Sequence, residues 1–313
     1  MNSSTGVLMT SRQKFWRGVF RNWQLYVFLA PAVIYFCMFE YAPMYGVQLA
    51  FKELSLRAGI TASPWADPLF KHFLKFFSGH MFLTVIKNTI VLNLYSLIAG
   101  FPLPIILAIL LNELKNKRFM KIVQNVTYAP HFISVVILVG MIKLFFMSRG
   151  IMNQLLMFFS LPTKDFLNRG ELFPHLYVWT GIWQGVGYSS IIYFAALSGV
   201  PPELHEAAII DGASRLKRIW HINLPHILPT VVILLILNTA YIMSIGFEKI
   251  FLMQNGLNLG YSEVISTYIY KLGIQQRSYS LGSAVGLFNN VINLTFMMLI
   301  NQIAKKVAGI SLF

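Results

Sequence analysis

The sequence predicts an all-α integral membrane protein with six transmembrane helices, and its composition and apolar pattern are the two observations behind this. The chain has 313 residues, of which 56% are hydrophobic and 12% are charged, whereas a soluble domain carries about 25% charged residues. The apolar residues fall in blocks of about 20, the length with which a helix crosses the ~30 Å hydrocarbon core of a bilayer. The alternating segments typical of a membrane β-barrel are absent, so each block is expected to be a helix.

Six apolar blocks follow one another along the chain. Their expected bounds are Leu25–Val47, Leu83–Leu111, Ile122–Phe146, Leu176–Val200, Ile227–Phe247 and Ala284–Ile303. The second block contains Pro102 and Pro104, so its helix is expected to be tilted or kinked, because proline removes a helical hydrogen bond. The organisation that follows is one membrane domain over 25–303 between tails at 1–24 and 304–313.

The N-terminal tail is predicted to be a helix lying on the membrane surface, with a flexible basic tail as the alternative. Aromatic residues alternate there with basic ones, a combination suited to the headgroup layer. They are Arg12, Lys14, Phe15, Trp16, Arg17, Phe20, Arg21 and Trp23. No cleavable signal peptide is expected, because the tail is long and polar and no small-residue cleavage pattern follows it.

Basic residues in the connections predict that both termini face the cytoplasm, since cytoplasmic loops carry an excess of Lys and Arg. With the N-terminus inside, the cytoplasmic segments hold 13 Lys and Arg in 70 residues and the outer ones 10 in 100. The cytoplasmic segments are 1–24, 112–121, 201–226 and 304–313, and the outer ones are 48–82, 147–175 and 248–283. Topology thus explains the net charge of +14. A nucleic-acid partner is not expected, because nucleic-acid binding needs basic residues gathered on one soluble face.

The connection 201–226 is predicted to form a helix–glycine–helix element. Two prolines and Glu203 mark the start of its first helix, because proline suits the first turn and a carboxylate complements the helix dipole. Gly212 suits the end of that helix, in the left-handed backbone conformation that glycine adopts most easily. Ser214 is expected to cap a second short helix, Arg215–His221, which the next proline ends. Such an element on the cytoplasmic side is suited to docking onto another subunit.

The spacing of residues in this connection resembles the EAA loop of ABC importer permeases. Glu206-Ala207-Ala208 is followed by three residues, Gly212, nine residues and Ile222-Asn223-Leu224-Pro225. The resemblance implies the type I ABC importer permease architecture, in which this loop is a coupling helix that fits a groove in a cytoplasmic ATPase subunit. Small residues for close approach and polar residues for directional contacts are expected to meet that subunit, namely Glu206, Ala207, Ala208, Asp211, Gly212, Ala213 and Arg215.

Other segments resemble the carbohydrate branch of that family, which is related to the maltose permease. They are Arg21–Tyr26, Pro43–Gly46, Tyr128–Ile133 and Gly181–Gly185. The likeness is greatest to the subgroup that handles complex oligosaccharides, including those from uronic-acid polymers. It implies oligosaccharide import across the bacterial cytoplasmic membrane with three kinds of partner: a second homologous permease, two ATPase subunits and an extracytoplasmic sugar-binding protein.

The sequence lacks the patterns of several other functions. No Gly-x-x-x-x-Gly-Lys-Ser/Thr phosphate-binding loop occurs, so ATP and Mg²⁺ are expected to bind to the partner ATPase. No HExxH motif or carboxylate–histidine cluster occurs, so no metal site is expected. No acid–base cluster supports a membrane enzyme. A proton- or sodium-driven carrier is the main alternative. Such carriers usually have charged residues inside the bundle, but the only Asp, Glu, Lys or Arg residues in the six spans are Glu40, Lys87 and Lys143, all near the outer ends, and no proton relay is evident.

Polar residues at helical spacing in the last three spans are candidates for the substrate path, because each pair lies on one helix face. They are Gln184 and Tyr188, Asn238 and Tyr241, and Asn289 and Asn293. Amide and aromatic groups suit a sugar, although such residues also tie helices together at about 0.6 kcal/mol each. Gly181 and Gly185 are expected to be helix-packing contacts.

The charge of the outer connections favours an acidic cargo. They carry 10 basic and 6 acidic side chains, a net charge of +4. A basic vestibule concentrates anionic solutes, and salt screens this effect over a Debye length of ~8 Å. The alternative is that these side chains bind lipid headgroups or the binding protein, with a neutral cargo.

Overall fold

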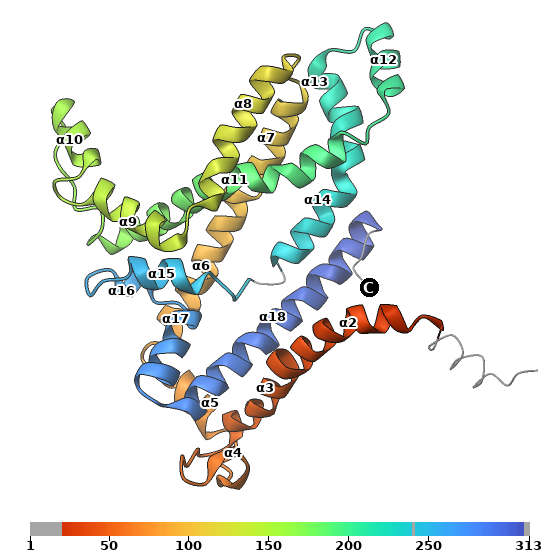
Figure 1. Ribbon diagram of the computed structural model, residues 1–313. Helices are drawn as coiled ribbons and strands as arrows, with labels where there is room; N and C mark the ends of the chain where they lie inside the picture. Colours follow the sequence, from red (N-terminus) through yellow and green to blue (C-terminus); the bar gives the residue numbers. More distant parts are fainter. Residues whose placement is uncertain (1–20, 240–241, 310–313) are drawn as a thin grey trace, which may run out of the picture.

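The structure is a computed structural model that describes residues 21–239 and 242–309, and the architecture of this part is helical (Figure 1). Its one β-contact is an isolated bridge between Lys52 and Trp65. Five helical stretches are long and apolar enough to cross a membrane, which confirms an all-α protein with several membrane spans. These stretches are Trp23–Phe51, Phe82–Asn112, Val135–Phe158, Arg215–Thr239 and Tyr279–Lys306.

The elements follow the order of the chain. The α-helices are α2 (Trp23–Phe36), α3 (Ala42–Met44), α4 (Gly59–Ala62), α5 (Lys71–Phe77), α6 (Phe82–Gly100), α7 (Pro102–Asn112), α8 (Lys117–Tyr128), α9 (Val135–Phe146), α10 (Ile151–Phe158), α11 (Phe173–Leu197), α12 (Pro202–Ile210), α13 (Arg215–Arg218), α14 (Leu224–Thr239), α15 (Phe247–Met253), α16 (Leu259–Ser262), α17 (Ile265–Tyr270) and α18 (Tyr279–Ala308). The π-helical segments are η1 (Cys37–Tyr41), η5 (Ile219–Asn223) and η6 (Lys271–Gln275). The 3-10 segments are η2 (Tyr45–Phe51), η3 (Ala129–Phe132) and η4 (Gly170–Leu172).

Three predicted spans coincide with long helical stretches. The first corresponds to α2 through η2, the second to α6 and α7, and the last to α18. The second stretch is interrupted at Phe101, directly before Pro102, as the prolines there predict. The predicted fourth span falls on α11, which is 25 residues long but is not among the five apolar stretches. The count of six spans therefore stays a prediction.

The predicted third span, Ile122–Phe146, is wrong as a single helix. The chain forms α8 and then α9, separated by the 3-10 segment η3. Pro130 lies in η3 and has no N–H to continue the helical ladder. Ser134 then begins α9, because its side-chain oxygen accepts a hydrogen bond from the backbone N–H of Ile137 at 3.4 Å. The apolar stretch in this region is α9 with α10, which lies further along the chain.

The predicted fifth span, Ile227–Phe247, also has the wrong bounds. The helix ends at Thr239 and begins at Arg215, so α13, η5 and α14 form one stretch. Pro225 was expected to end a short helix, yet the helix passes through it. The five residues before Leu224, Ile219–Asn223, are π-helical, and the N–H of Leu224 donates to the carbonyl of Ile219. This wider turn accommodates a proline, whose ring would clash with an α-helical carbonyl four residues earlier.

The helix α11 organises the packing. It packs along α7 and also contacts α6, α8 and α14. The approach to α8 is closest at Gly187, where an added Cβ would overlap the backbone of Thr127. Lipid tails are as apolar as leucine, so close packing and hydrogen bonds stabilise helix pairs in a membrane. A small residue at position 187 therefore permits the α8–α11 contact.

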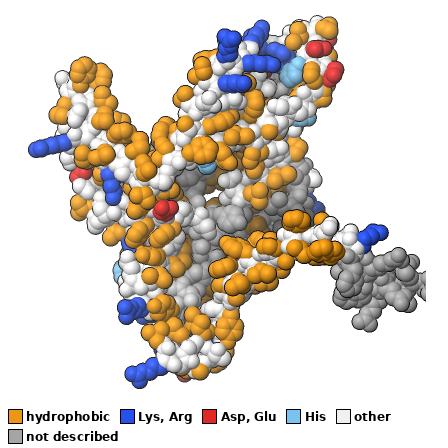
Figure 2. Space-filling view, viewed as in Figure 1, with side chains coloured by type: hydrophobic (Ala, Val, Ile, Leu, Met, Phe, Trp, Pro, Cys, Tyr) orange, Lys and Arg blue, Asp and Glu red, His pale blue; other side chains and the backbone are white. Residues whose placement is uncertain are grey.

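The first helix has a different environment. No side chain of α2 is buried, and the apolar stretch that begins with α2 packs against α18 mainly through η2. Figure 2 shows a nearly continuous hydrophobic surface over α2. Of the predicted interfacial helix, Phe15, Trp16 and Phe20 lie outside the described residues, and Trp23 begins α2. The side of α2 facing away from this chain is available to lipid or to another subunit.

Candidate coupling loop and translocation path

The predicted coupling loop is a well-formed helical hairpin that projects from one end of the molecule (Figure 1). Pro202 is the first residue of α12, and Glu203 lies in its first turn. The helix ends in a Schellman motif: the N–H of Gly212 donates to the carbonyl of Ile209 at 3.0 Å, and that of Ala213 to Ala208 at 2.8 Å. Gly212 has a φ of +74°. The predicted left-handed backbone conformation is confirmed.

The hairpin leads directly into an apolar helix. Ser214 caps α13 by accepting a hydrogen bond from the N–H of Lys217 at 3.4 Å, as predicted. The helix then continues without a break through η5 and α14 to Thr239. The hairpin is therefore joined to the bundle by one continuous helical stretch. This arrangement suits a coupling element better than the separate short helix that the sequence predicted.

The hairpin has an exposed surface in this chain. Of the predicted contact residues, five are exposed and two are half-buried: Glu206, Ala207, Asp211, Gly212 and Arg215 are exposed, and Ala208 and Ala213 are half-buried. Large apolar side chains are exposed beside them, including Ile210 at 86% and Leu216 at 69%. Figure 2 shows basic side chains gathered near α13 and acidic ones at α12. An apolar surface with charges of both signs around it is typical of a docking surface.

Tyr188 and Asn238 line the same cavity, of about 450 Å³, between α6, α7, α11 and α14. The ring of Tyr188 stacks on His131, with a centroid distance of 3.8 Å and an interplanar angle of 2°. The amide of Asn238 donates to the carbonyl of Leu234 in its own helix at 2.7 Å. Their side chains can therefore offer a flat surface and an amide oxygen to a sugar.

The other predicted path residues have different surroundings. Gln184 lines a second cavity and donates to the carbonyl of Ile133 at 2.9 Å, so it also holds η3 against α11. Asn293 accepts from the N–H of Met243 at 2.9 Å and joins α18 to the segment after α14. The side-chain oxygen of Asn289 is buried without a hydrogen-bond partner. Tyr241 lies outside the described residues.

The second cavity, of about 390 Å³, contains a lysine that no sequence pattern marks as a site residue. Lys249 on α15 lines it together with Gln184 and both glycines that were expected to pack helices. An added Cβ on Gly185 would meet nothing within 4 Å, and one on Gly181 would meet only the Lys249 Nζ at 3.2 Å. The packing interpretation is therefore wrong for Gly185, which faces open space, whereas Gly181 lies close to the side chain of Lys249 on α15.

The charge of Lys249 is buried. The residue is 9% exposed, and its Nζ donates to the carbonyl of Tyr177 at 2.8 Å and lies 4.8 Å from the centroid of that ring. The helix α15 lies outside the five apolar stretches. Burial lowers the pKa of Lys249 to about 8, because desolvation disfavours the charged amine. Its place in the cavity beside α11 follows from the packing of α15, and no pattern in the sequence shows it.

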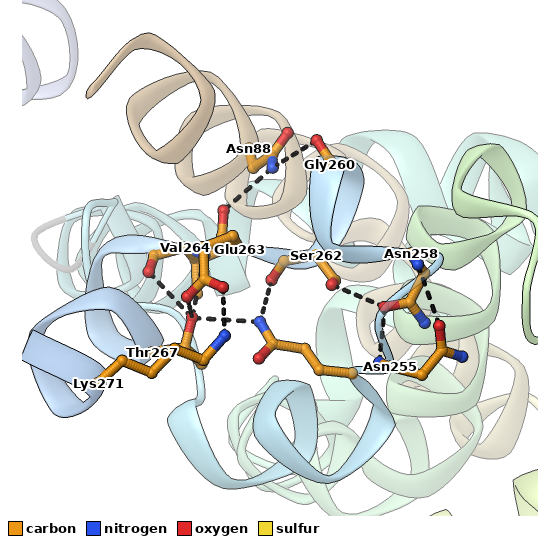
Figure 3. A network of polar contacts seen from close by, with 10 residues as sticks. Asn88, Asn255, Asn258, Gly260, Ser262, Glu263, Val264, Thr267 and Lys271 are labelled. Atoms are coloured by element: carbon orange, nitrogen blue, oxygen red, sulfur yellow. Dashed lines mark hydrogen bonds and ion pairs between the residues drawn. The ribbon is translucent and has the colours of Figure 1, made fainter. Parts of the chain in front are cut away.

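A buried polar network holds the segment α15–η6 in place (Figure 3). Glu263 is paired with Lys271, and its Oε1 accepts from the hydroxyl of Thr267 at 2.8 Å. The amide of Asn88 on α6 donates to the carbonyls of Gly260 and Glu263, both at 3.0 Å. The segment that carries Lys249 is thus attached to α6 by directional bonds. Among the described residues no group of His, Cys, Asp and Glu is arranged to hold a metal ion.

Known proteins resemble the chain over most of its length. Polygalacturonan/rhamnogalacturonan transport system permease protein YteP of Bacillus subtilis (strain 168) is 41% identical over 283 residues, with 90% of this chain and 88% of that protein covered. Protein LplB of the same organism is 39% identical over 287 residues, with 91% and 90% covered. A crystal structure of a bacterial ABC transporter involved in the import of the acidic polysaccharide alginate contains a chain with a TM-score of 0.87 and 39% identity, with 94% of this chain and 99% of that chain covered.

A second crystal structure, of the bacterial alginate ABC transporter in complex with an alginate pentasaccharide-bound periplasmic protein, gives a TM-score of 0.87 at 38% identity, with 95% of this chain and 99% of that chain covered. Residues 100–309 match the family described as binding-protein-dependent transport system inner membrane component. This match includes the hairpin α12–α13 and both cavities' residues on α11, which agrees with the resemblance in the sequence. The chain therefore belongs to the family of binding-protein-dependent transport system inner membrane components and is a permease subunit of an ABC importer, not an enzyme.

Proposed function

We propose that this permease pairs with a second, homologous permease, engages two cytoplasmic ATPase subunits, and imports an acidic oligosaccharide delivered by an extracytoplasmic binding protein. ATP and Mg²⁺ bind to the ATPase subunits, and this chain contributes one coupling hairpin and part of the path. The termini face the cytoplasm in the bacterial inner membrane, with 112–121 and 201–226 on the same side. In support, these two segments lie at the same end of the molecule (Figure 1).

The observation that carries the proposal is the exposed hairpin α12–α13. It combines the EAA spacing, a Schellman motif at Gly212 and a set of exposed apolar and charged side chains. It is also continuous with the apolar helix that ends at Thr239. Docking of an ATPase subunit on this hairpin would move α14, which lines the larger cavity through Leu234 and Asn238.

An acidic cargo is supported by the relatives and by charge. YteP is described as a polygalacturonan/rhamnogalacturonan permease and the matching structures as alginate importers, and all of these polymers contain uronic acids. The outer connections of this chain carry a net charge of +4, which attracts anions at low salt. Uptake of a uronate oligosaccharide should therefore exceed that of a matched neutral one, with a difference that narrows as salt rises.

The coupling role is tested with the reconstituted importer in proteoliposomes. Glu206→Ala should lower substrate-stimulated ATP hydrolysis by at least about tenfold, the equivalent of about 1.4 kcal/mol, while the binding protein still captures sugar normally. Glu171→Ala is the matched control, because Glu171 is also exposed but lies on η4 in an outer connection. Equal stimulation in both variants would contradict the assignment of the hairpin.

A further inference from the structure

We propose that Lys249 receives a carboxylate of the cargo inside the translocation path and so determines preference for acidic over neutral oligosaccharides. This inference rests on the proposed function and deepens it by naming the residue that recognises the charge. Lys249 lies on α15, between the fifth and sixth predicted spans, and lines the 390 Å³ cavity beside α11. A volume of this size is within the range of small-molecule sites.

The charge of Lys249 has no carboxylate partner in the described part of the chain. The ion pairs found there are Lys71–Glu53 and Lys271–Glu263. The neighbouring Glu248 is exposed and is not paired with Lys249. The residues lining the cavity include no Asp or Glu. The ammonium of Lys249 has one neutral carbonyl and the Tyr177 ring as its partners. Burying a charge without a counter-charge is costly, and a cargo carboxylate in the cavity would offset that cost.

Small side chains line much of the cavity. Four glycines and two serines line it, so backbone and hydroxyl groups can approach a sugar closely. They are Gly100, Gly181, Gly185, Gly246, Ser96 and Ser189. The ammonium lies against Gly181, since an added Cβ there would be 3.2 Å from Nζ. A side chain at position 181 would therefore occupy the space beside the charge that a cargo carboxylate needs.

The cavity beside Lys249 adjoins the cavity that contains Tyr188 and Asn238. The 390 Å³ and 450 Å³ cavities share four lining residues: Ser96, Gly100, Pro104 and Ser189. A chain of sugar rings in the larger cavity could place one carboxylate near Lys249 while another ring stacks on Tyr188. The bond from Nζ to the Tyr177 carbonyl uses one of the three ammonium donors, which leaves two for a carboxylate.

The competing explanation is that Lys249 only ties α15 to α11 through the Tyr177 carbonyl. Two variants separate these roles in the reconstituted importer with its binding protein and ATPase subunits. Lys249→Met keeps the length of the stem and removes the charge, and Lys249→Arg keeps the charge. The probes are a galacturonate oligosaccharide and the same oligosaccharide with every carboxyl methyl-esterified. Lys164→Met is the matched control, because Lys164 is an exposed lysine of an outer connection.

We expect Lys249→Met to lower kcat/KM for uptake of the acidic probe at least tenfold and to change that of the esterified probe less than twofold. Lys249→Arg and Lys164→Met should keep the preference of the parent importer. If Lys249→Met lowers kcat/KM for uptake of both probes equally, or of neither, the role of Lys249 is overturned and the proposed cargo is left intact. A parent importer that takes up only the esterified probe would overturn the acidic cargo and, with it, the role of Lys249.

Discussion

At the scale of single residues, Gly212 shows why one position of the hairpin α12–α13 needs glycine. Three glycines of the described chain have positive φ: Gly59, Gly212 and Gly309. A Cβ on Gly212 would meet nothing within 4 Å, so packing inside this chain does not require glycine there. The requirement comes from the left-handed backbone and, if the hairpin docks as proposed, from the close approach of the ATPase subunit.

Substitutions at Gly212 separate these two causes. Gly212→Val should abolish coupled transport, because a β-branched residue is strained at this φ. Gly212→Asn should keep the hairpin, since asparagine tolerates the left-handed region, but should lower substrate-stimulated ATP hydrolysis through the added side chain. Gly59→Val is the control, because Gly59 has a φ of +71° and open space around it but lies in an outer connection. Full coupling in Gly212→Val would contradict the docking of this hairpin.

At the scale of elements, π-helical turns precede two of the prolines through which a helical stretch continues. The segments η1 and η5 each end two residues before a proline, Pro43 and Pro225. In both, the N–H just before the proline bonds five residues back, from Ala42 to Cys37 and from Leu224 to Ile219. The prolines predicted a helix boundary in the second case, and this prediction was wrong because the wider turn removes the clash. The hairpin α12–α13 is therefore joined to α14 without a break.

The ion pair between Glu263 and Lys271 is expected to stabilise the segment α15–η6, and thermal unfolding of the complex tests this. Glu263→Ala leaves the ammonium of Lys271 largely buried without its partner, at a cost of about 3 kcal/mol. The apparent Tm of the purified complex should fall by at least about 5 °C. Glu53→Ala breaks the ion pair between Glu53 and Lys71, in which both side chains are about half exposed. This change should lower the free energy of unfolding by less than about 1 kcal/mol.

A double-variant cycle with Lys271→Ala completes that test. If the buried pair stabilises the segment, Glu263→Ala combined with Lys271→Ala should destabilise the complex less than the sum of the single variants. Equal melting temperatures for Glu263→Ala and Glu53→Ala would show that the network in Figure 3 does not stabilise the segment.

At the scale of the whole molecule, the chain presents surfaces to partners on several sides. The hairpin α12–α13 is exposed at one end, and α2 has no buried side chain. The apolar clusters of the interior gather instead around α6, α11 and the segment α15–α17. This distribution is consistent with a subunit whose outer helix and hairpin are covered only in a larger assembly.

The proposed orientation can be tested with cysteine labelling, because Cys37 is the one cysteine of the chain. In a Cys37→Ser background, Leu56→Cys should react with a membrane-impermeant maleimide in intact spheroplasts, since Leu56 is 74% exposed in an outer connection. Lys117→Cys, at the exposed start of α8, should react only after the membrane is permeabilised. The reverse pattern would place the termini outside and contradict the positive-inside prediction.

Residue composition and local pattern are enough to predict the all-α membrane class and the turn of the hairpin α12–α13 at Gly212. Both follow from local properties: apolar length, helix-start prolines, and a glycine at a position of positive φ. The tertiary structure alone decided which polar groups meet, as with Lys249 and the carbonyl of Tyr177, 72 residues apart, or Asn88 and Glu263. Such contacts depend on how far each helix is rotated and shifted against its neighbours, and the spacing of residues within one helix does not encode that.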